Sequence, residues 1–186
     1  MEDMLLLLEP ILVMGTTESN NGDVSGNHGR IDGWFVKLSP YGSIQWQRCL
    51  GGAWEDRLYS IVQTTDAGFI LKEFTSSVDG DVSSNHGGND AWVVKLSASG
   101  SLQWQRCLGG SRSELGKSVI QSADGGYIFT GIADSNDGDV SGNHVNFIEA
   151  GDAWIVKLSS LGNSRLGQTH CSSVLIPKTW LFQLFN

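Results

Sequence analysis

The chain has 186 residues, of which 40% are hydrophobic, and it contains 24 Gly but only 3 Pro. This composition suits a single globular domain with many tight turns and is too polar for a membrane protein. The formal net charge of −8 argues against a nucleic-acid partner, because an acidic surface repels phosphate groups.

The N-terminal segment is apolar but short. Four consecutive leucines at positions 5–8 follow an acidic start and precede Glu9 and Pro10. A signal peptide begins with basic residues, and a membrane-spanning helix needs about 20 apolar residues. We therefore expect neither a credible signal peptide nor a membrane span here, and we predict a strand over residues 5–15.

Several short motifs then recur in the same order along the chain. Trp34 and Trp92 are 58 residues apart, and Trp92 and Trp154 are 62 apart because of four extra residues between His144 and Asp152. The recurring motifs are GWFVKLS at 33–39, 91–97 and 153–159 with small changes, QWQRCLGG at 45–52 and 103–110, and GDVS-x-NH at 22–28, 80–86 and 138–144. Such self-similarity indicates a repeat architecture.

Each repeat predicts four short strands and no helix. In the first complete unit the strands cover residues 34–38, 44–50, 58–64 and 69–75, which are rich in β-branched and aromatic residues. Tight turns separate them, and no segment keeps a helical period. A four-stranded antiparallel unit of about 58 residues has the size of one β-propeller blade.

The predicted fold is therefore all-β, an incomplete β-propeller, with a β-solenoid as the less favoured alternative. Two complete blades cannot close a ring, so we expect open sheet faces and self-association through them. The predicted domain covers residues 1–163, with a leading fourth strand at 5–15, blades at 33–75 and 91–131, and a trailing first strand at 153–159.

Two places depart from the repeat. Residues 164–186 lack the QWQRC motif and form an atypical tail, which we interpret as the scar of a frameshift or truncation. Glu73 occupies the position of Gly15 and Gly131, which suggests relaxed constraint or a changed contact at the rim.

The three cysteines do not indicate a disulfide. Cys49 and Cys107 occupy the same position in successive units, and packed sheets lie about 10 Å apart, which is too far for a bridge. We expect both to be small core residues. Cys171 lies in the atypical tail and is not assigned.

The motifs together resemble a family of bacterial repeat proteins. The segments that carry this resemblance are QWQRCLGG at 103–110, DGGYI at 124–128, SNDGDVSGNH at 135–144 and DAWIVKL at 152–158. Members of that family are predicted to form β-propellers in secreted or cell-surface proteins and have no settled activity. The resemblance covers residues 11–163 and implies an extracellular or cell-surface scaffold. Separately, the sequence leaves open a protein or a glycan as its partner.

The polar GDVS-x-NH loops are the best candidates for a metal site. Calcium binds six to eight oxygen ligands, and these loops are rich in carboxylates and amides. The candidate ligands are Asn21 and Asp23 in the first loop, Asp79 and Asp81 in the second, and Asp134, Asn136, Asp137 and Asp139 in the third. The alternative is that these side chains cap their own backbone in turns, as Asp and Asn often do.

Other recurring side chains favour structural roles. His28, His86 and His144 occur once per unit, so they diverge rather than converge on a transition metal. The Trp residues could line a carbohydrate-binding face, but alternation within strands favours the core for Trp34, Trp92, Trp154, Trp46 and Trp104. Trp54 lies outside the pattern and is a better candidate for a surface contact. Arg48 and Arg106 are expected to pair with acids such as Glu55 or Glu114.

No catalytic motif is present, since the chain has no nucleophile elbow, phosphate-binding loop or metalloprotease motif. The sequence therefore predicts a non-enzymatic interaction scaffold. The alternative is a glycan-binding or glycan-hydrolysing propeller fragment.

Overall fold

The structure is a computed structural model that describes residues 11–144 and 151–172, with the side chains placed up to residue 164. The described part consists of eleven strands and contains no helix. Accordingly, no helix within these residues is long and apolar enough to cross a membrane. The all-β class predicted from the sequence is confirmed.

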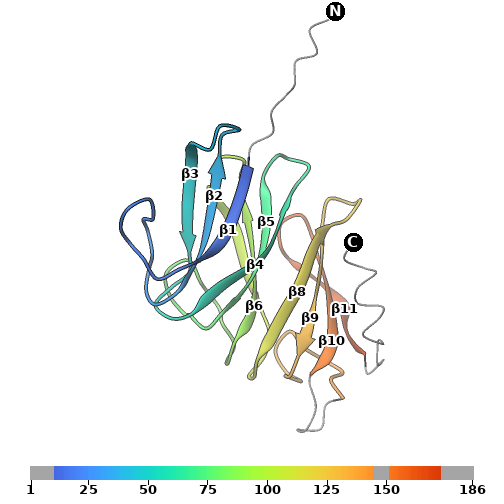
Figure 1. Ribbon diagram of the computed structural model, residues 1–186. Coiled ribbons are helices and arrows are strands. Elements are labelled where there is room, and N and C mark those ends of the chain that lie inside the picture. The colour runs from blue at the N-terminus through green and yellow to red at the C-terminus, as the bar shows by residue number, and fades with distance from the viewer. Residues whose placement is uncertain (1–10, 145–150, 173–186) are drawn as a thin grey trace, which may run out of the picture.

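The strands form three antiparallel sheets that follow one another along the chain (Figure 1). Their strand orders are β1-β2-β3, β4-β5-β6-β7 and β8-β9-β10-β11. The first sheet contains β1 (Ile11–Thr17), β2 (Asp32–Leu38) and β3 (Ile44–Leu50). The middle sheet contains β4 (Asp56–Gln63), β5 (Phe69–Thr75), β6 (Asp90–Leu96) and β7 (Leu102–Leu108). The third sheet contains β8 (Glu114–Gln121), β9 (Tyr127–Ala133), β10 (Asp152–Leu158) and β11 (Ser164–Ser172).

The sheets do not coincide with the blades expected over residues 33–75 and 91–131. Each of those ranges joins the last two strands of one sheet to the first two strands of the next. The chain passes between sheets at the Gly-Gly pairs of residues 51–52 and 109–110, while β5 pairs with β6 across the polar loop. A tandem repeat has no intrinsic first strand, so only the pairing decides where a sheet begins.

The tail that was expected to be atypical begins with a regular strand. β11 pairs antiparallel with β10, and the pairing places Cys171 opposite Trp154. The same register places Cys49 opposite Trp34 and Cys107 opposite Trp92. Residues 164–172 thus take the place of the missing QWQRC strand, whereas residues 5–10 and 173–186 lie outside the described residues.

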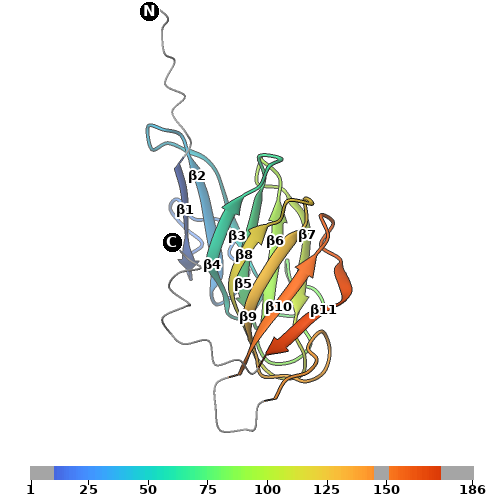
Figure 2. The same cartoon turned by 90° about the vertical axis from the view of Figure 1, so that its right-hand side faces the viewer.

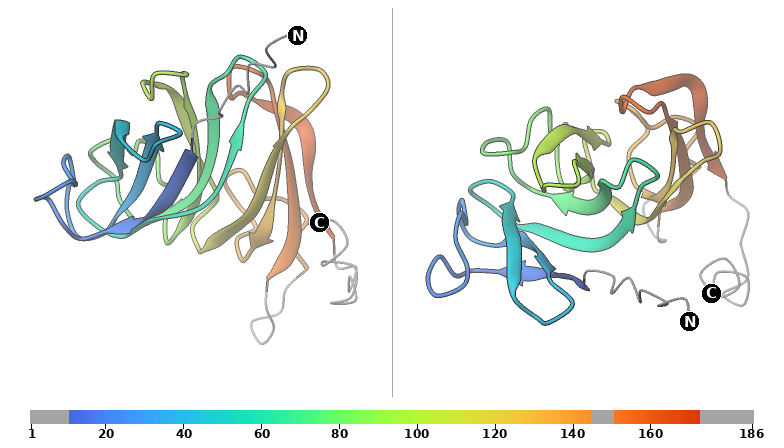
Figure 3. Two further views of the ribbon diagram at one scale, coloured as in Figure 1. Left: turned by 45° about the horizontal axis from the view of Figure 1, so that its top comes forward. Right: turned by 90° about the horizontal axis from the view of Figure 1, so that it is seen from above.

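The middle sheet is buried on both faces, and its two central strands explain why. Every residue of β5 and β6 is buried. Phe69, Leu71 and Trp92 pack toward the first sheet, and Ile70 and Val93 pack toward the third. Figures 2 and 3 show the three sheets stacked side by side. Because successive strand residues point to opposite faces, these apolar runs require a neighbouring sheet on each side.

A tryptophan and a glycine interlock at each junction between sheets. A Cβ atom at Gly100, in the β6–β7 turn, would lie 2.8 Å from the ring of Trp46 in the first sheet. Gly162 approaches the ring of Trp104 in the same way, at 2.7 Å. Both glycines have a φ of +77°, so the turn and the close approach both exclude a side chain.

The packing predicts very different effects for two tryptophan substitutions. Trp92 is fully buried between the first two sheets, whereas Trp54 is 59% exposed. We expect Trp92→Ala to lower the free energy of unfolding by about 3–5 kcal/mol, as for large aromatic residues in cores. Trp54→Ala, the matched control, should change it by less than about 0.5 kcal/mol. Urea denaturation measures both, and equal losses would contradict this packing.

Candidate functional site

Two equivalent pockets open at the junctions between neighbouring sheets. We call the one between the first and middle sheets junction pocket 1 and the one between the middle and third sheets junction pocket 2. Their volumes are about 320 and 310 Å³. Pocket 1 is lined by side chains that include His28, Gln47, Arg48, Cys49 and Asp81, and pocket 2 by their counterparts His86, Gln105, Arg106, Cys107 and Asp139.

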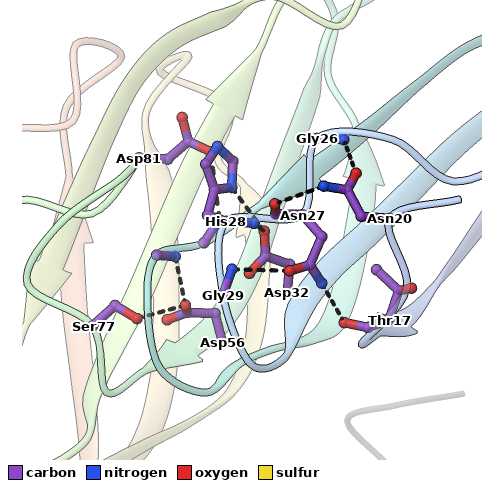
Figure 4. Close-up of polar contacts among 12 residues, drawn as sticks. Thr17, Asn20, Gly26, Asn27, His28, Gly29, Asp32, Asp56, Ser77 and Asp81 are labelled. Atoms are coloured by element: carbon purple, nitrogen blue, oxygen red, sulfur yellow. Dashed lines mark hydrogen bonds and ion pairs between the residues drawn. The ribbon is translucent and has the colours of Figure 1, made fainter.

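The histidine of each pocket is fixed by an aspartate at the start of a strand. In pocket 1, His28 Nδ1 lies 2.7 Å from Asp32 Oδ2, which also accepts a hydrogen bond from the His28 amide (Figure 4). His86 and Asp90 repeat this pair at 2.7 Å. Both histidines are thus held by hydrogen bonds to an aspartate four residues further along the chain. Because Asp32 holds one ring nitrogen, Nε2 is left for other groups.

The aspartate of each pocket comes from the next sheet. Asp81, on the β5–β6 loop, lies 3.8 Å from His28 Nε2, and its carboxylate accepts a hydrogen bond from the amide of Gly51. In pocket 2, Asp139 lies 4.0 Å from His86 Nε2 and accepts from Gly109. Each pocket therefore exists only because two sheets meet there.

A second carboxylate on the same loops also clamps neighbouring backbone. Asp79 Oδ1 accepts a hydrogen bond of 2.7 Å from the Ala53 amide, and Asp137 Oδ1 accepts one of 2.8 Å from Ser111. The Ser111 amide lowers the pKa of Asp137, as expected when a hydrogen bond favours the ionised form. Both amides belong to the segments that connect one sheet to the next.

The remaining candidate calcium ligands are spread over the loops. Asn21 accepts from the Ser19 hydroxyl and Asn136 from the Asn143 amide, Asp134 lies beside Gly151, and Asp23 is exposed. Within residues 11–144 and 151–164, no group of three or more His, Cys, Asp or Glu side chains is arranged to hold a metal ion. The geometry supports the capping alternative, and calcium binding stays a prediction.

Two substitutions at Asp79 separate the capping role from calcium binding. If the carboxylate only accepts a hydrogen bond from Ala53, Asp79→Ala should lower the free energy of unfolding by about 1 kcal/mol. Asp79→Asn should be nearly as stable as the unchanged protein, because its amide oxygen can still accept that bond. Added Ca²⁺ should then produce no calorimetric heat and no shift in melting temperature. A calcium heat that Asp79→Asn abolishes would instead establish the metal site.

The arginines do not pair with the expected acids. The Arg48 guanidinium donates from Nε to the carbonyl of Gly100, and Arg106 donates to Asn163. Glu55 pairs with Arg30 instead, and Glu114 accepts from backbone amides. The predicted pairing with Glu55 or Glu114 was therefore wrong, and both arginines are exposed beside the pockets.

The glutamine of each pocket connects the core to the rim. Trp34 Nε1 donates to Gln47 Oε1 at 2.9 Å, and Trp92 Nε1 donates to Gln105 Oε1 at 2.7 Å. Each glutamine in turn donates to a loop serine, Ser25 or Ser83. Trp92 and Trp154 are fully buried, which confirms the core role for these two, and Trp54 is exposed as expected.

The cysteines at the pocket floors are free thiols. Cys49 and Cys107 are buried, as predicted, and no disulfide joins them. Burial and the nearby carboxylates of Asp32 and Asp81 raise the pKa of Cys49 to about 11. Burial raises the pKa of Cys107 as well. A thiol with a raised pKa stays protonated near neutral pH and is a poor nucleophile.

A fully buried carboxylate lies beneath pocket 1. Glu73 was expected at the rim or in a region of relaxed constraint, but it is fully buried, and neither of its carboxyl oxygens has a hydrogen-bond partner in the described structure. Burial is the main cause that raises its pKa well above the usual value, and the carboxylates of Asp56, Asp32 and Asp81 add to this effect. The neighbouring Lys72 opposes it only in part.

This arrangement makes stability depend on pH. Below the ordinary glutamate pKa of 4.5, Glu73 is protonated in both the folded and the unfolded state, so no charge is buried on folding. As the pH rises above that value, the unfolded state loses its proton before the native state does, so stability falls until the native carboxyl ionises. Buried Glu73 thus destabilises the protein at neutral pH.

Glu73→Gln should therefore stabilise the protein in a pH-dependent way. We expect a gain on the order of 1–3 kcal/mol at pH 7, because Gln cannot ionise and each unit by which burial raises the pKa of Glu73 is worth about 1.4 kcal/mol. The gain should shrink toward pH 4. Chemical denaturation at several pH values measures it. Glu18→Gln, at an exposed position, is the control. A gain independent of pH would contradict ionisation as its cause.

Comparison with known proteins adds no assignment, since no protein-family model and no curated protein matches the chain. The pocket residues were visible in the sequence as the repeated QWQRC and GNH or SNH motifs. The sequence did not show that these residues meet in one pocket, because the motifs that line a pocket come from two different sheets.

Proposed function

We propose that the chain is a non-enzymatic interaction module of a secreted or cell-surface protein, and that its sheets are blades of a β-propeller. The stacking of three antiparallel sheets in chain order, joined by short connections, supports the propeller. The single observation that carries the function is that the same pocket occurs at both described junctions.

The chemistry of the pockets favours a hydroxyl-rich ligand. Each pocket offers a planar amide, a guanidinium, an imidazole and a carboxylate, with serine hydroxyls at the rim. Such groups donate and accept hydrogen bonds in fixed directions, which suits a sugar ring. A volume near 300 Å³ is at the small end of ligand sites, so each pocket fits one residue of a glycan.

Equivalent pockets on one rigid body also fit a repetitive partner. A glycan chain or a cell-surface protein that presents the same group several times gains affinity by engaging two pockets at once. This advantage needs no new contact, so each pocket can bind weakly by itself. The presence of two equivalent pockets therefore favours a role in binding a repetitive partner.

The protonation state of the pocket argues against covalent catalysis. The protonated Cys49 thiol is a poor nucleophile, and His28 Nε2 faces Asp81 instead of a hydroxyl or thiol that it could activate. Most glycoside hydrolases use two carboxyl groups that flank the scissile glycosidic bond. Asp32 instead holds the histidine ring and Asp81 a backbone amide.

A glycan array tests this function. We expect the intact chain to bind a subset of glycans and the double variant Arg48→Ala/Arg106→Ala to lose at least about ten-fold in affinity, because both exposed arginines line the pockets. Arg57→Ala, which removes an arginine away from the pockets, is the control. Melting temperatures verify that the variants are folded.

Two outcomes would overturn the proposal. Binding to no glycan, or binding that the double variant retains in full, would exclude the pockets as glycan sites. Hydrolysis of any member of a panel of chromogenic glycosides would exclude a non-enzymatic role and favour the alternative of a glycan-hydrolysing propeller.

A further inference from the structure

The two outermost sheet faces of the described structure are apolar and differ from each other. The face of the third sheet that points away from the middle sheet, which we call the far face, exposes Leu115, Ile120 and Ile155. We call the face of the first sheet that points away from the middle sheet the near face. The near face of the first sheet exposes Ile11 and Val13, with Trp34 partly exposed beside them. Apolar side chains exposed on an outer sheet face favour an interaction site.

Each outer face reproduces one half of the internal junctions. Ile155 corresponds to Val93, and Ile120 to Val62, which pack in the core between the middle and third sheets. In the same way, Ile11 and Val13 correspond to Phe69 and Leu71, and Trp34 to Trp92, which form the core between the first and middle sheets. At an internal junction, the earlier sheet contributes residues equivalent to those of the far face. The later sheet contributes residues equivalent to those of the near face.

The polar groups at the two ends match in the same way. His144 lies 3.2 Å from Asp152 and is 61% exposed, whereas His28 and His86 are 35% and 34% exposed because an aspartate of the next sheet faces them. Asp23 occupies the loop position of Asp81 and Asp139 and is exposed. At the internal junctions the residue equivalent to His144 faces an aspartate of the following sheet. The residue equivalent to Asp23 faces a histidine of the preceding sheet.

From this correspondence we infer that the far face of the third sheet binds the near face of the first sheet of a second copy of this chain. The contact is head-to-tail, and it places Asp23 of one copy against His144 of the other. The two patches differ, so every bound copy leaves one patch of each kind open for another copy.

This contact is weaker than the internal junctions. The described first sheet has three strands, whereas β4 and β8 begin the other two sheets and lie at their junctions. The described residues of an incoming first sheet present three strands, β1, β2 and β3, so this part of the contact buries less apolar area than a four-stranded sheet does. The association is therefore reversible and depends on protein concentration.

Sedimentation velocity over a series of concentrations tests this inference. The weight-average mass of the intact chain should rise with concentration. Ile155→Glu, which places a charge on the far face, and Val13→Glu, which places one on the near face, should each remain monomeric. Tyr41→Glu, in an exposed turn outside both faces, is the control and should associate like the intact chain.

Mixing the two variants is the decisive step. Ile155→Glu retains the near face and Val13→Glu retains the far face, so an equimolar mixture should form a dimer and nothing larger. Asp23→Asn should weaken association of the intact chain by about two- to five-fold, the usual strength of an exposed ion pair. Circular dichroism confirms that each variant is folded.

Three results would overturn the inference. The first is an intact chain that stays monomeric at every concentration. The second is a mixture of the two variants that does not associate, which would exclude a head-to-tail contact. The third is self-association of either variant alone, which would mean that copies pair through like faces or through another surface.

Discussion

Apolar strands hold each sheet of this protein against the next, and the pockets and the clamping loops lie where the sheets meet. A single four-stranded sheet has two faces, and β5 and β6 carry apolar residues on both of them. Neither face can meet water without a large cost, so the middle sheet is stable only between two others. The glycine turns that receive Trp46 and Trp104 fix how closely the sheets approach.

The junction pockets follow from this stacking. The loops between β5 and β6 and between β9 and β10 reach back to the preceding sheet, where Asp79 and Asp137 hold the connecting backbone. The same loops carry Asp81 and Asp139 to the histidines of that sheet. A structural clamp and a polar pocket are thus built from one motif, and each further junction would add another pocket.

Charge is distributed unevenly between the two junctions. Glu73 adds an unpaired carboxyl to the first junction, whereas Gly131 occupies the same position at the second. Glu73→Gln should raise the stability of the protein and leave the lining of pocket 1 unchanged, because Glu73 does not line that pocket. The two junctions can therefore be compared within one chain, since only the first contains a buried carboxyl at this position.

Alternation and recurrence are local properties, so the amino-acid sequence alone predicted the all-β class, the strand positions within a few residues and the core roles of Trp92, Cys49 and Cys107. It misplaced the sheet boundaries, since strand pairing depends on register with distant residues. It also gave no sign that β11 pairs with β10, because β11 lacks the QWQRC motif. It also misplaced Glu73 and the partners of Arg48 and Arg106. Only the tertiary structure decided which residues meet in the pockets, because His28 and Asp81 belong to different sheets and approach each other only when those sheets stack.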